Sequence, residues 1–144
     1  MIAVETNLLV YAHREDSPWH EAAFRCLGGL AREPAPWAIP WSCLHEFLAI
    51  VTHPRIYRPP TPLPIALEQV DAWLEAPSLT LLSESHGYWV SLRQALESGF
   101  VAGAMVHDAR VAALCEHHGV RELWSADRDF TRFPNVTVRN PLIT

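Results

Sequence analysis

The chain has 144 residues, of which 49% are hydrophobic, and a formal net charge of −5. This length and apolar content predict a single domain over residues 1–144 with a sizeable core, and no apolar run approaches the roughly 20 residues that span a bilayer. The negative charge argues against a protein that attracts nucleic acid through its overall field. Local arginines and metal cations would have to offset that field at any nucleic-acid site.

Apolar segments of strand length alternate along the chain with longer segments of helical periodicity. Strands are predicted up to Val4 and at residues 37–39, 79–82, 122–125 and 136–138. Helices are predicted at residues 8–13, 18–30, 41–52, 65–74, 85–97 and 101–118. Residues 53–64 contain too many prolines for either element and are predicted to be a loop. This alternation predicts an α/β fold around a parallel sheet with helices on both faces.

The three cysteines are widely separated and lie among apolar neighbours, at Cys26, Cys43 and Cys115. This pattern is typical of reduced thiols in the core of a cytosolic protein, and not of disulfides or zinc ligands. Because the chain also lacks a positively charged start that leads into a long apolar run, we expect a cytoplasmic protein without a membrane segment.

The first predicted strand runs directly into a carboxylate, because Glu5 follows Val4 and precedes Thr6 and Asn7. In a parallel α/β sheet, ligands bind at the carboxyl ends of the strands. Glu5 is therefore a candidate site residue.

Glu46 interrupts a predicted helix that is apolar almost all round. Such a helix is expected to be buried, and a buried carboxylate normally pairs, protonates or binds a metal. A glutamate at the helix edge that reaches water is the equally open alternative.

Asp108 lies on the apolar face of the next candidate helix, at spacings of three, four and seven from Val101, Ala104, Met105, Val111, Ala112 and Cys115. This spacing predicts that Asp108 points inward. The alternative is a structural cap near the helix start.

A fourth acidic segment follows the strand predicted at residues 122–125, where Ser125, Asp127 and Asp129 come directly after the apolar residues. Asp127 stands closer to the strand end and is the first choice for a site residue, with Asp129 in reserve. One of the two aspartates could instead only cap the following turn.

Carboxylates brought close together repel and raise one another's pKa, and divalent cations relieve this conflict. Mg²⁺ and Mn²⁺ prefer oxygen ligands, and a set of four acids without cysteine or paired histidine suits them better than Zn²⁺. One or two such ions can activate a water for attack on a phosphodiester. A serine–histidine–aspartate mechanism is a rival, but no nucleophile elbow or glycine-rich phosphate loop is present.

Several short motifs, in this order and at this spacing, make the chain resemble PIN-domain proteins, and within them the VapC-type toxins. These motifs are VETNLLVYA at 4–12, EF at 46–47, THPR at 52–55, HDA at 107–109, EHHG at 116–119, SADRDF at 125–130 and RNPL at 139–142. No single motif is specific, but together they extend over nearly the whole chain.

The resemblance implies a three-layer α/β/α fold and an endoribonuclease activity that depends on Mg²⁺ or Mn²⁺. It places Glu46, Asp108 and Asp127 on the family's acidic positions. Asn7 and Ser125 match small polar residues that orient the carboxylates or the metal waters. The resemblance also implies a homodimer and a VapB-type antitoxin whose tail enters the acidic groove.

One position departs from the family, since Glu5 stands where the family's pattern has aspartate. The extra methylene displaces the carboxylate by roughly 1.5 Å, and misplacement by about 1 Å can cost on the order of 10²-fold in rate. We therefore expect a weakly active enzyme with an intact metal pocket.

The sequence as a whole thus predicts an endoribonuclease toxin in which Glu5, Glu46, Asp108 and Asp127 form the acidic site, with Glu5, Asp108 and Asp127 as metal ligands. Contacts with RNA or the antitoxin are predicted for three arginines, Arg55, Arg58 and Arg128. The alternatives are a catalytically silent PIN module that binds RNA or a partner protein, which Glu5 would favour, and a metal-dependent nuclease for structured DNA or a phosphatase.

Overall fold

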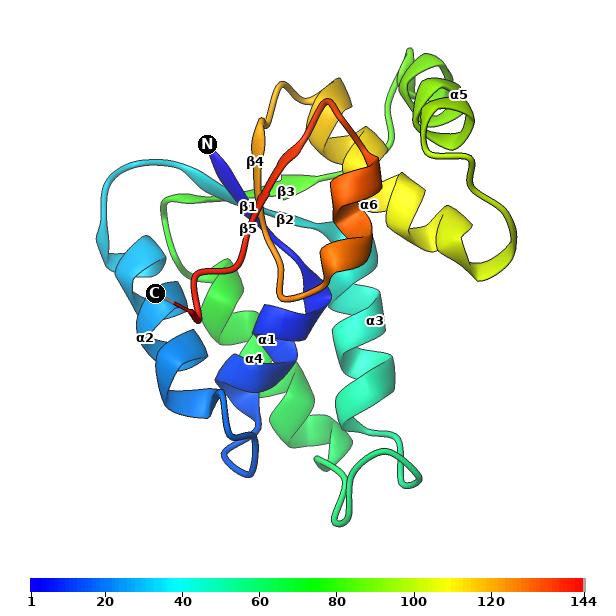
Figure 1. The fold of residues 1–144 in the computed structure, drawn as a ribbon. Coiled ribbons are helices and arrows are strands. Elements are labelled where there is room, and N and C mark those ends of the chain that lie inside the picture. Colours follow the sequence, from blue (N-terminus) through cyan, green and yellow to red (C-terminus); the bar gives the residue numbers. More distant parts are fainter. Residues whose placement is uncertain (144) are drawn as a thin grey trace.

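A five-stranded, all-parallel sheet forms the centre of the computed structural model, which describes residues 1–143 (Figure 1). Its strands are β1 (Ile2–Val4), β2 (Trp37–Pro40), β3 (Leu79–Leu82), β4 (Glu122–Trp124) and β5 (Thr137–Arg139). They lie side by side in the order β3-β2-β1-β4-β5, so β1 is central and pairs in parallel with both β2 and β4. The predicted parallel sheet is confirmed.

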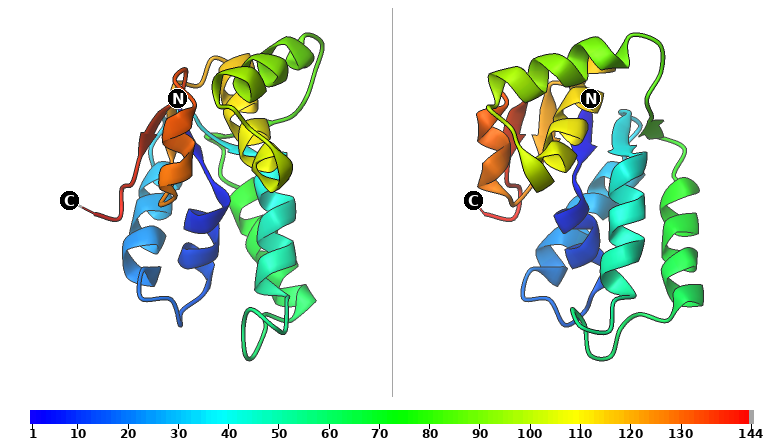
Figure 2. Two further views of the ribbon diagram at one scale, coloured as in Figure 1. Left: turned by 45° about the vertical axis from the view of Figure 1, so that its right-hand side comes forward. Right: turned by 90° about the vertical axis from the view of Figure 1, so that its right-hand side faces the viewer.

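Within residues 1–143, six α-helices and two 3₁₀ turns surround this sheet. They are α1 (Thr6–His13), α2 (His20–Arg32), α3 (Trp41–Val51), α4 (Leu63–Leu74), α5 (Tyr88–Ser98), η1 (Gly103–Met105), α6 (Val106–His117) and η2 (Arg128–Arg132). Figure 1 shows α2 on one side of the sheet and α5 and α6 on the other, which confirms the predicted α/β/α layers. Helices α1, α3 and α4 extend beyond the carboxyl edge of the sheet, as the two turned views also show (Figure 2). None of the described helices has the length and apolarity needed to cross a bilayer.

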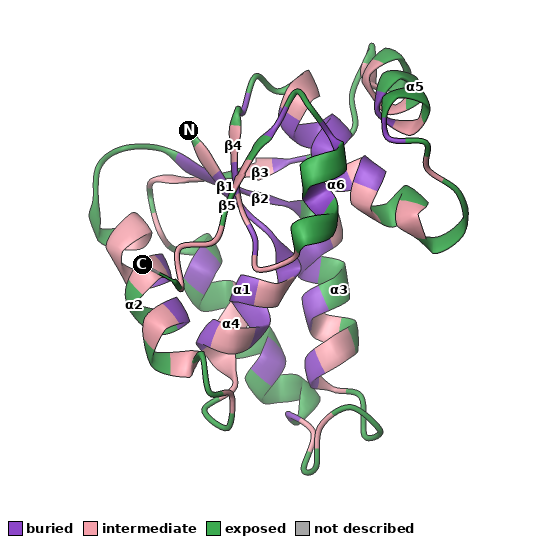
Figure 3. Cartoon of the chain, viewed as in Figure 1, coloured by how far each residue is buried: buried purple, intermediate pink, exposed green. Residues whose placement is uncertain are grey.

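The two central strands are the most deeply buried part of the molecule. Ala3 and Val4 of β1 and the segment 37–39 of β2 are fully inaccessible to solvent. Strands covered by helices on both faces are expected to be apolar throughout, and these are. Figure 3 shows the buried residues on the strands and on the inner sides of the helices. The core therefore holds β1 rigidly, together with the residues that follow it.

Five helix starts differ from their predicted positions, those of α1, α2, α4, α5 and α6, and three of these differences have a clear local cause. Helix α1 begins at Thr6 because Glu5 caps it, and α2 begins at His20 because residues 17–20 form a turn in which His20 N donates to Ser17 O (3.1 Å). Before α6, Gly103 adopts φ +64°, a conformation that favours glycine, and starts a 3₁₀ turn. The predicted helix over 101–118 is thus shorter, and Asp108 lies in the first turn of α6.

The proline-rich loop, residues 53–62, is fastened to the end of α1 by Arg14. The Arg14 guanidinium donates to Pro59 O (3.0 Å) and Thr61 Oγ1 (3.2 Å), lies 4.2 Å from the centre of the Tyr57 ring, and pairs with Asp16. The Arg14 side chain is only 11% exposed. One side chain therefore holds the second half of the loop against the end of α1.

Replacing Arg14 by alanine should lower the free energy of unfolding by about 2 kcal/mol, because it removes charged hydrogen bonds and a cation–π contact from a largely buried site. Urea unfolding measures this loss, and trypsin should cut faster after the exposed Arg55 once the loop is released. Arg93→Ala is the control, since Arg93 forms only an exposed pair with Glu97 and should cost at most about 0.5 kcal/mol. Equal losses in the two variants would contradict the role of Arg14.

Candidate functional site

The candidate site lies at the carboxyl edge of the sheet, where β1 and β4 end side by side. Strands β2 and β3 lie on one side of β1, and β4 and β5 lie on the other. The direction in which successive strands are added therefore reverses between β1 and β4. Glu5 N donates to Trp124 O (3.0 Å) and thereby joins the two strand ends. Ligands bind at such reversal points in open α/β sheets.

Glu5 is a buried carboxylate at this reversal point, with an exposed fraction of 7%. Its Oε2 accepts hydrogen bonds from Asn7 N (3.1 Å) and, more weakly, from Ser125 Oγ (3.4 Å). The first bond caps the N-terminus of α1, where a carboxylate also interacts favourably with the helix dipole. The prediction that an acid stands at the end of the first strand is confirmed.

The pKa of Glu5 is raised from 4.5 to about 7. Burial is the largest cause, the hydrogen bond from Asn7 N opposes it, and the charges of Glu46 and Asp108 raise the pKa further. The two charges that act on Glu5 come from α3 and α6, so acids that are far apart in the sequence lie close enough in the fold to repel one another.

In the metal-free protein, Glu5→Gln should raise the free energy of unfolding by about 3 kcal/mol at pH 8 and by less than about 1 kcal/mol at pH 4.5. The folded protein holds the Glu5 proton up to a pH of about 7, whereas the unfolded chain releases it near 4.5. The stabilisation from protonated Glu5 is therefore complete below about pH 4.5 and is lost as the pH rises through 7. Glutamine stays neutral and removes this loss.

Urea unfolding of both proteins in EDTA across this pH range measures the effect. Glu68→Gln on α4 is the control, because Glu68 is exposed and should leave the pH dependence unchanged. Parallel pH profiles for wild type and Glu5→Gln would contradict the assigned shift.

Asn7 and Ser125 connect the starts of the two segments that carry acids. Asn7 Nδ2 donates to Ser125 Oγ (3.2 Å), and Asn7 Oδ1 accepts from Ala126 N (3.3 Å). Ser125 Oγ also accepts from Asp127 N (3.0 Å). These bonds connect Glu5, through the two polar side chains, to the backbone of the segment that carries Asp127.

Three aspartates form an acidic cluster beside Glu5: Asp108, Asp127 and Asp129 each offer a carboxylate oxygen, and these oxygens lie within 4.8 Å of one another. Asp127 also caps η2, since its Oδ1 accepts from Asp129 N (2.8 Å). The sequence favours Asp127 as the site residue and offers Asp129 as the alternative, and the structure brings both into the cluster. The tight turn of η2 is what carries Asp129 back towards Asp108.

Asp108 lies close to the other acids of the site, because its charge acts on Glu5 and the charges of Glu46, Asp127 and Asp129 act on it. Its side chain is half-buried, and its pKa is raised, first by burial and then by the charges of Asp127, Glu46 and Asp129. Arg132 on η2 opposes this shift. Asp108 faces the other acids but is only half-buried, because it lies in the first turn of α6 and not in the middle of a longer helix.

Glu46 lies on the open side of the site. The prediction that α3 is buried all round is wrong, because Trp41, His45, Glu46 and Ala49 are exposed and only the opposite side of α3 packs into the core. The apolar residues of that exposed side gave no signal of exposure. Glu46 lines a pocket of about 270 Å³ together with His45, His107 and Arg110, which sequence reasoning did not connect with the site.

The predicted contact arginines lie in two different places. Arg128 is exposed on η2, directly after Asp127. Arg55 and Arg58 are exposed in the proline-rich loop, at the end of α3 that points away from the sheet (Figure 1). An 11-residue helix is roughly 16 Å long, so these two side chains lie well apart from the acidic cluster.

The comparisons with known proteins agree with this geometry. The model of the PIN domain family matches residues 2–136. Ribonuclease VapC43 of Mycobacterium tuberculosis is 36% identical over 142 residues, with 99% of this chain and 96% of the relative covered. Ribonuclease VapC48 of the same organism is 29% identical over 137 residues, with 95% and 94% covered. The structure of VapBC2 from Rickettsia felis bound to a promoter DNA fragment has a TM-score of 0.68 and 23% identity, with 97% and 98% covered.

Proposed function

Because the chain belongs to the PIN domain family, and within it to the VapC group, we propose that it is a metal-dependent endoribonuclease and the toxin of a VapBC-type toxin–antitoxin pair. The observation that carries this proposal is the acidic cluster at the strand-order reversal, in a chain that matches VapC ribonucleases over almost its full length. The names of these relatives favour RNA over structured DNA as substrate, and an enzyme over a silent binding module. We treat residues 1–144 as one catalytic domain.

The acidic cluster fits a hard divalent cation. Its donors are all carboxylate oxygens, and the repulsion that raises the pKa of Asp108 is the kind that a bound cation relieves. We assign Mg²⁺ or Mn²⁺ to this site, held by Asp108 and Asp127 with Asp129 beside them and Glu5 from the end of β1. When bound, such an ion lowers the pKa of water and stabilises negative charge on a phosphodiester.

The chain's own residues position these groups. Ser125 and Asn7 hold the Glu5 carboxylate and the segment that carries Asp127 in fixed relation, so the ligand oxygens need no large movement to bind. Glu46 completes the acidic site from α3, and its exposed carboxylate can accept a proton from the attacking water. Arg132, whose charge acts on Asp108 from η2, offsets part of the negative field that would repel an RNA phosphate.

We infer that the chain is bound and inhibited in the cytoplasm by a small VapB-type antitoxin whose tail enters the acidic groove, and that it forms a homodimer. The solved VapBC2 structure is of such a pair. Large apolar side chains on two helices support protein contacts, because Leu63 and Leu67 of α4 and Trp89 and Val90 of α5 are about half exposed or more. Arg55, Arg58 and Arg128 are the proposed charged contacts to RNA or antitoxin.

Co-expression with the neighbouring reading frame, followed by separation of the two proteins, tests the proposal. The isolated chain should cut total RNA at defined positions with Mg²⁺ or Mn²⁺. This cleavage should stop when EDTA or the partner is added. Its mass in solution should be that of a dimer. Absence of any metal-dependent cleavage of RNA, with the chain folded, would overturn the enzymatic proposal.

A further inference from the structure

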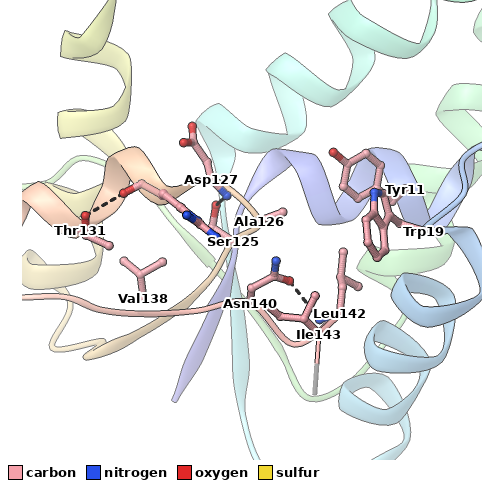
Figure 4. Close-up of a pocket in the computed structure, with 11 residues that line it drawn as sticks. Tyr11, Trp19, Ser125, Ala126, Asp127, Thr131, Val138, Asn140, Leu142 and Ile143 are labelled. Carbon is pink, nitrogen blue, oxygen red and sulfur yellow. Dashed lines mark hydrogen bonds between the residues drawn. The ribbon is translucent and has the colours of Figure 1, made fainter.

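A pocket of about 420 Å³ opens beside Asp127 of the acidic cluster (Figure 4). Ser125 and Asp127 line one end of it, and the rings of Trp19 and Tyr11 form the other end, with the segment after β5 between them. Its volume lies within the range of about 300 to 1,000 Å³ that small-molecule sites occupy. The pocket therefore leads from two residues of the candidate site to an aromatic wall.

The aromatic wall is held in place from both sides. Trp19 N donates to Ser17 Oγ (3.1 Å) in the turn before α2, and His20 Nδ1 is 3.0 Å from Tyr11 O. These contacts fasten the start of α2 to α1. The Trp19 side chain is nevertheless 43% exposed, so a large flat ring is presented to solvent on a fixed backbone.

Polar groups accompany the rings. Asn140 Oδ1 accepts from Leu142 N (3.0 Å), which leaves the Asn140 Nδ2 group on the pocket side (Figure 4). Arg128 lines the pocket next to Asp127 and supplies a positive charge. An aromatic face, an amide donor and a guanidinium are the groups with which proteins hold an unstacked RNA base and its phosphate.

We propose that this pocket binds the base of the RNA nucleotide next to the scissile phosphate, with Trp19 as the stacking ring and Asn140 as a hydrogen-bond donor to the base edge. The proposal rests on the ribonuclease function proposed above. A nucleotide is favoured over a peptide because the pocket combines the exposed Trp19 ring with the Arg128 guanidinium and adjoins the acidic site, which suits a base and its phosphate. A phosphodiester held at the acids thus places its neighbouring base at the pocket mouth.

Cleavage by Trp19 variants tests the stacking role. Trp19→Ala should lower kcat/KM on an RNA oligonucleotide that contains a mapped cut site by between about 5-fold and 150-fold, the effect of removing one base–aromatic stack. Trp19→Phe keeps a ring and should recover most of this loss. Phe24→Ala, which removes an exposed aromatic one turn into α2 that does not line the pocket, should cleave like wild type.

An abasic substrate separates base binding from a merely structural effect. Wild type should cut an oligonucleotide with an abasic nucleotide beside the cut site as slowly as Trp19→Ala cuts the normal one, and the two losses should not add. Nucleosides give a second measurement that needs neither metal nor cleavage. They should shift the indole N–H signal of Trp19 in the wild-type protein and leave that of the distant Trp89 unchanged.

The outcomes distinguish this inference from the function on which it rests. The subsite is wrong, and the ribonuclease function stands, under three joint results in a wild-type protein that cuts RNA. Trp19→Ala cleaves as fast as wild type, the abasic substrate is cleaved as fast as the normal one, and nucleosides do not shift the Trp19 signal. Unchanged cleavage by Trp19→Ala combined with weaker inhibition by the antitoxin would assign the pocket to a peptide and would also overturn the proposal. If wild type cuts no RNA, the function itself fails.

Discussion

Replacing Asp108 by asparagine should lower the rate of RNA cleavage by at least about 100-fold. Removal of a residue that only supports a metal ligand typically costs 10- to 100-fold, and Asp108 is proposed as a ligand itself. The charges of Asp127, Glu46 and Asp129 all raise its pKa, so its carboxylate lies close to the other acids of the proposed site. Cleavage of a fluorescent RNA with Mg²⁺ or Mn²⁺ measures the loss.

Thermal unfolding shows whether the loss comes from the metal or from the fold. Asp108→Asn should leave the Tm in EDTA unchanged or higher, because it removes a repelling charge from a half-buried position. Metal at about 100 times its Kd stabilises a protein by about 2.7 kcal/mol, which would raise the Tm of wild type by roughly 8 °C, and the variant should lack this rise. The control Asp71→Asn, on an exposed position of α4, should behave like wild type. Cleavage by Asp108→Asn within about 10-fold of wild type would argue against the assigned site.

Replacing Glu5 by aspartate should raise the rate of RNA cleavage by up to about 100-fold. The Glu5 carboxylate is held by Asn7 N and Ser125 Oγ at the end of β1, so its extra methylene cannot be absorbed by free movement in solvent. Aspartate would draw the carboxylate back by roughly 1.5 Å and is also a preferred residue for capping α1. Mg²⁺ tolerates distorted geometry poorly, and misplacement of about 1 Å can cost on the order of 10²-fold.

Rates with Mg²⁺ and Mn²⁺ should be compared for wild type, Glu5→Asp and Glu5→Gln. Glutamine removes the charge and should lower activity further, which shows that the carboxylate is used at all. The metal-induced rise in Tm should be larger for Glu5→Asp than for wild type. Equal and robust cleavage by wild type and Glu5→Asp would show that the site accommodates glutamate and that the chain is not attenuated.

Most of the fold could be predicted from local patterns. Strand β3 (Leu79–Leu82) was predicted at its exact bounds, and the proline-rich loop and the end of α3 follow from residues that cannot continue a helix. Helix starts were less predictable, because they depend on caps and turns. Glu5 caps α1 through Asn7 N, and the turn at residues 17–20 delays α2, and neither contact has a distinct pattern of apolar residues.

The candidate site could be predicted in its chemistry but not in its full membership. Glu5, Asp108 and Asp127 follow strands or interrupt apolar faces, which is a signal that a sequence carries. Asp129 joins the cluster because it lies in the first turn of η2, which Asp127 caps, and Glu46 is exposed because that side of α3 faces an open pocket and not the core. The position of Asp129 and the exposure of Glu46 thus depend on how elements pack against each other in the fold.

The alternation of strands with helices, and the acids at strand ends or on an apolar helix face, are evident in the amino-acid sequence because both are patterns over a few neighbouring residues. Which of these acids meet depends on the packing of the folded chain. The reversal of strand order between β1 and β4 brings Glu5 beside Ser125, and α6 begins at the same edge with Asp108. The same packing places Trp19, which belongs to a turn more than 100 residues away from Asp127, at the far end of a shared pocket. Contacts between residues so distant in the chain depend on how whole elements pack, and no local pattern encodes them.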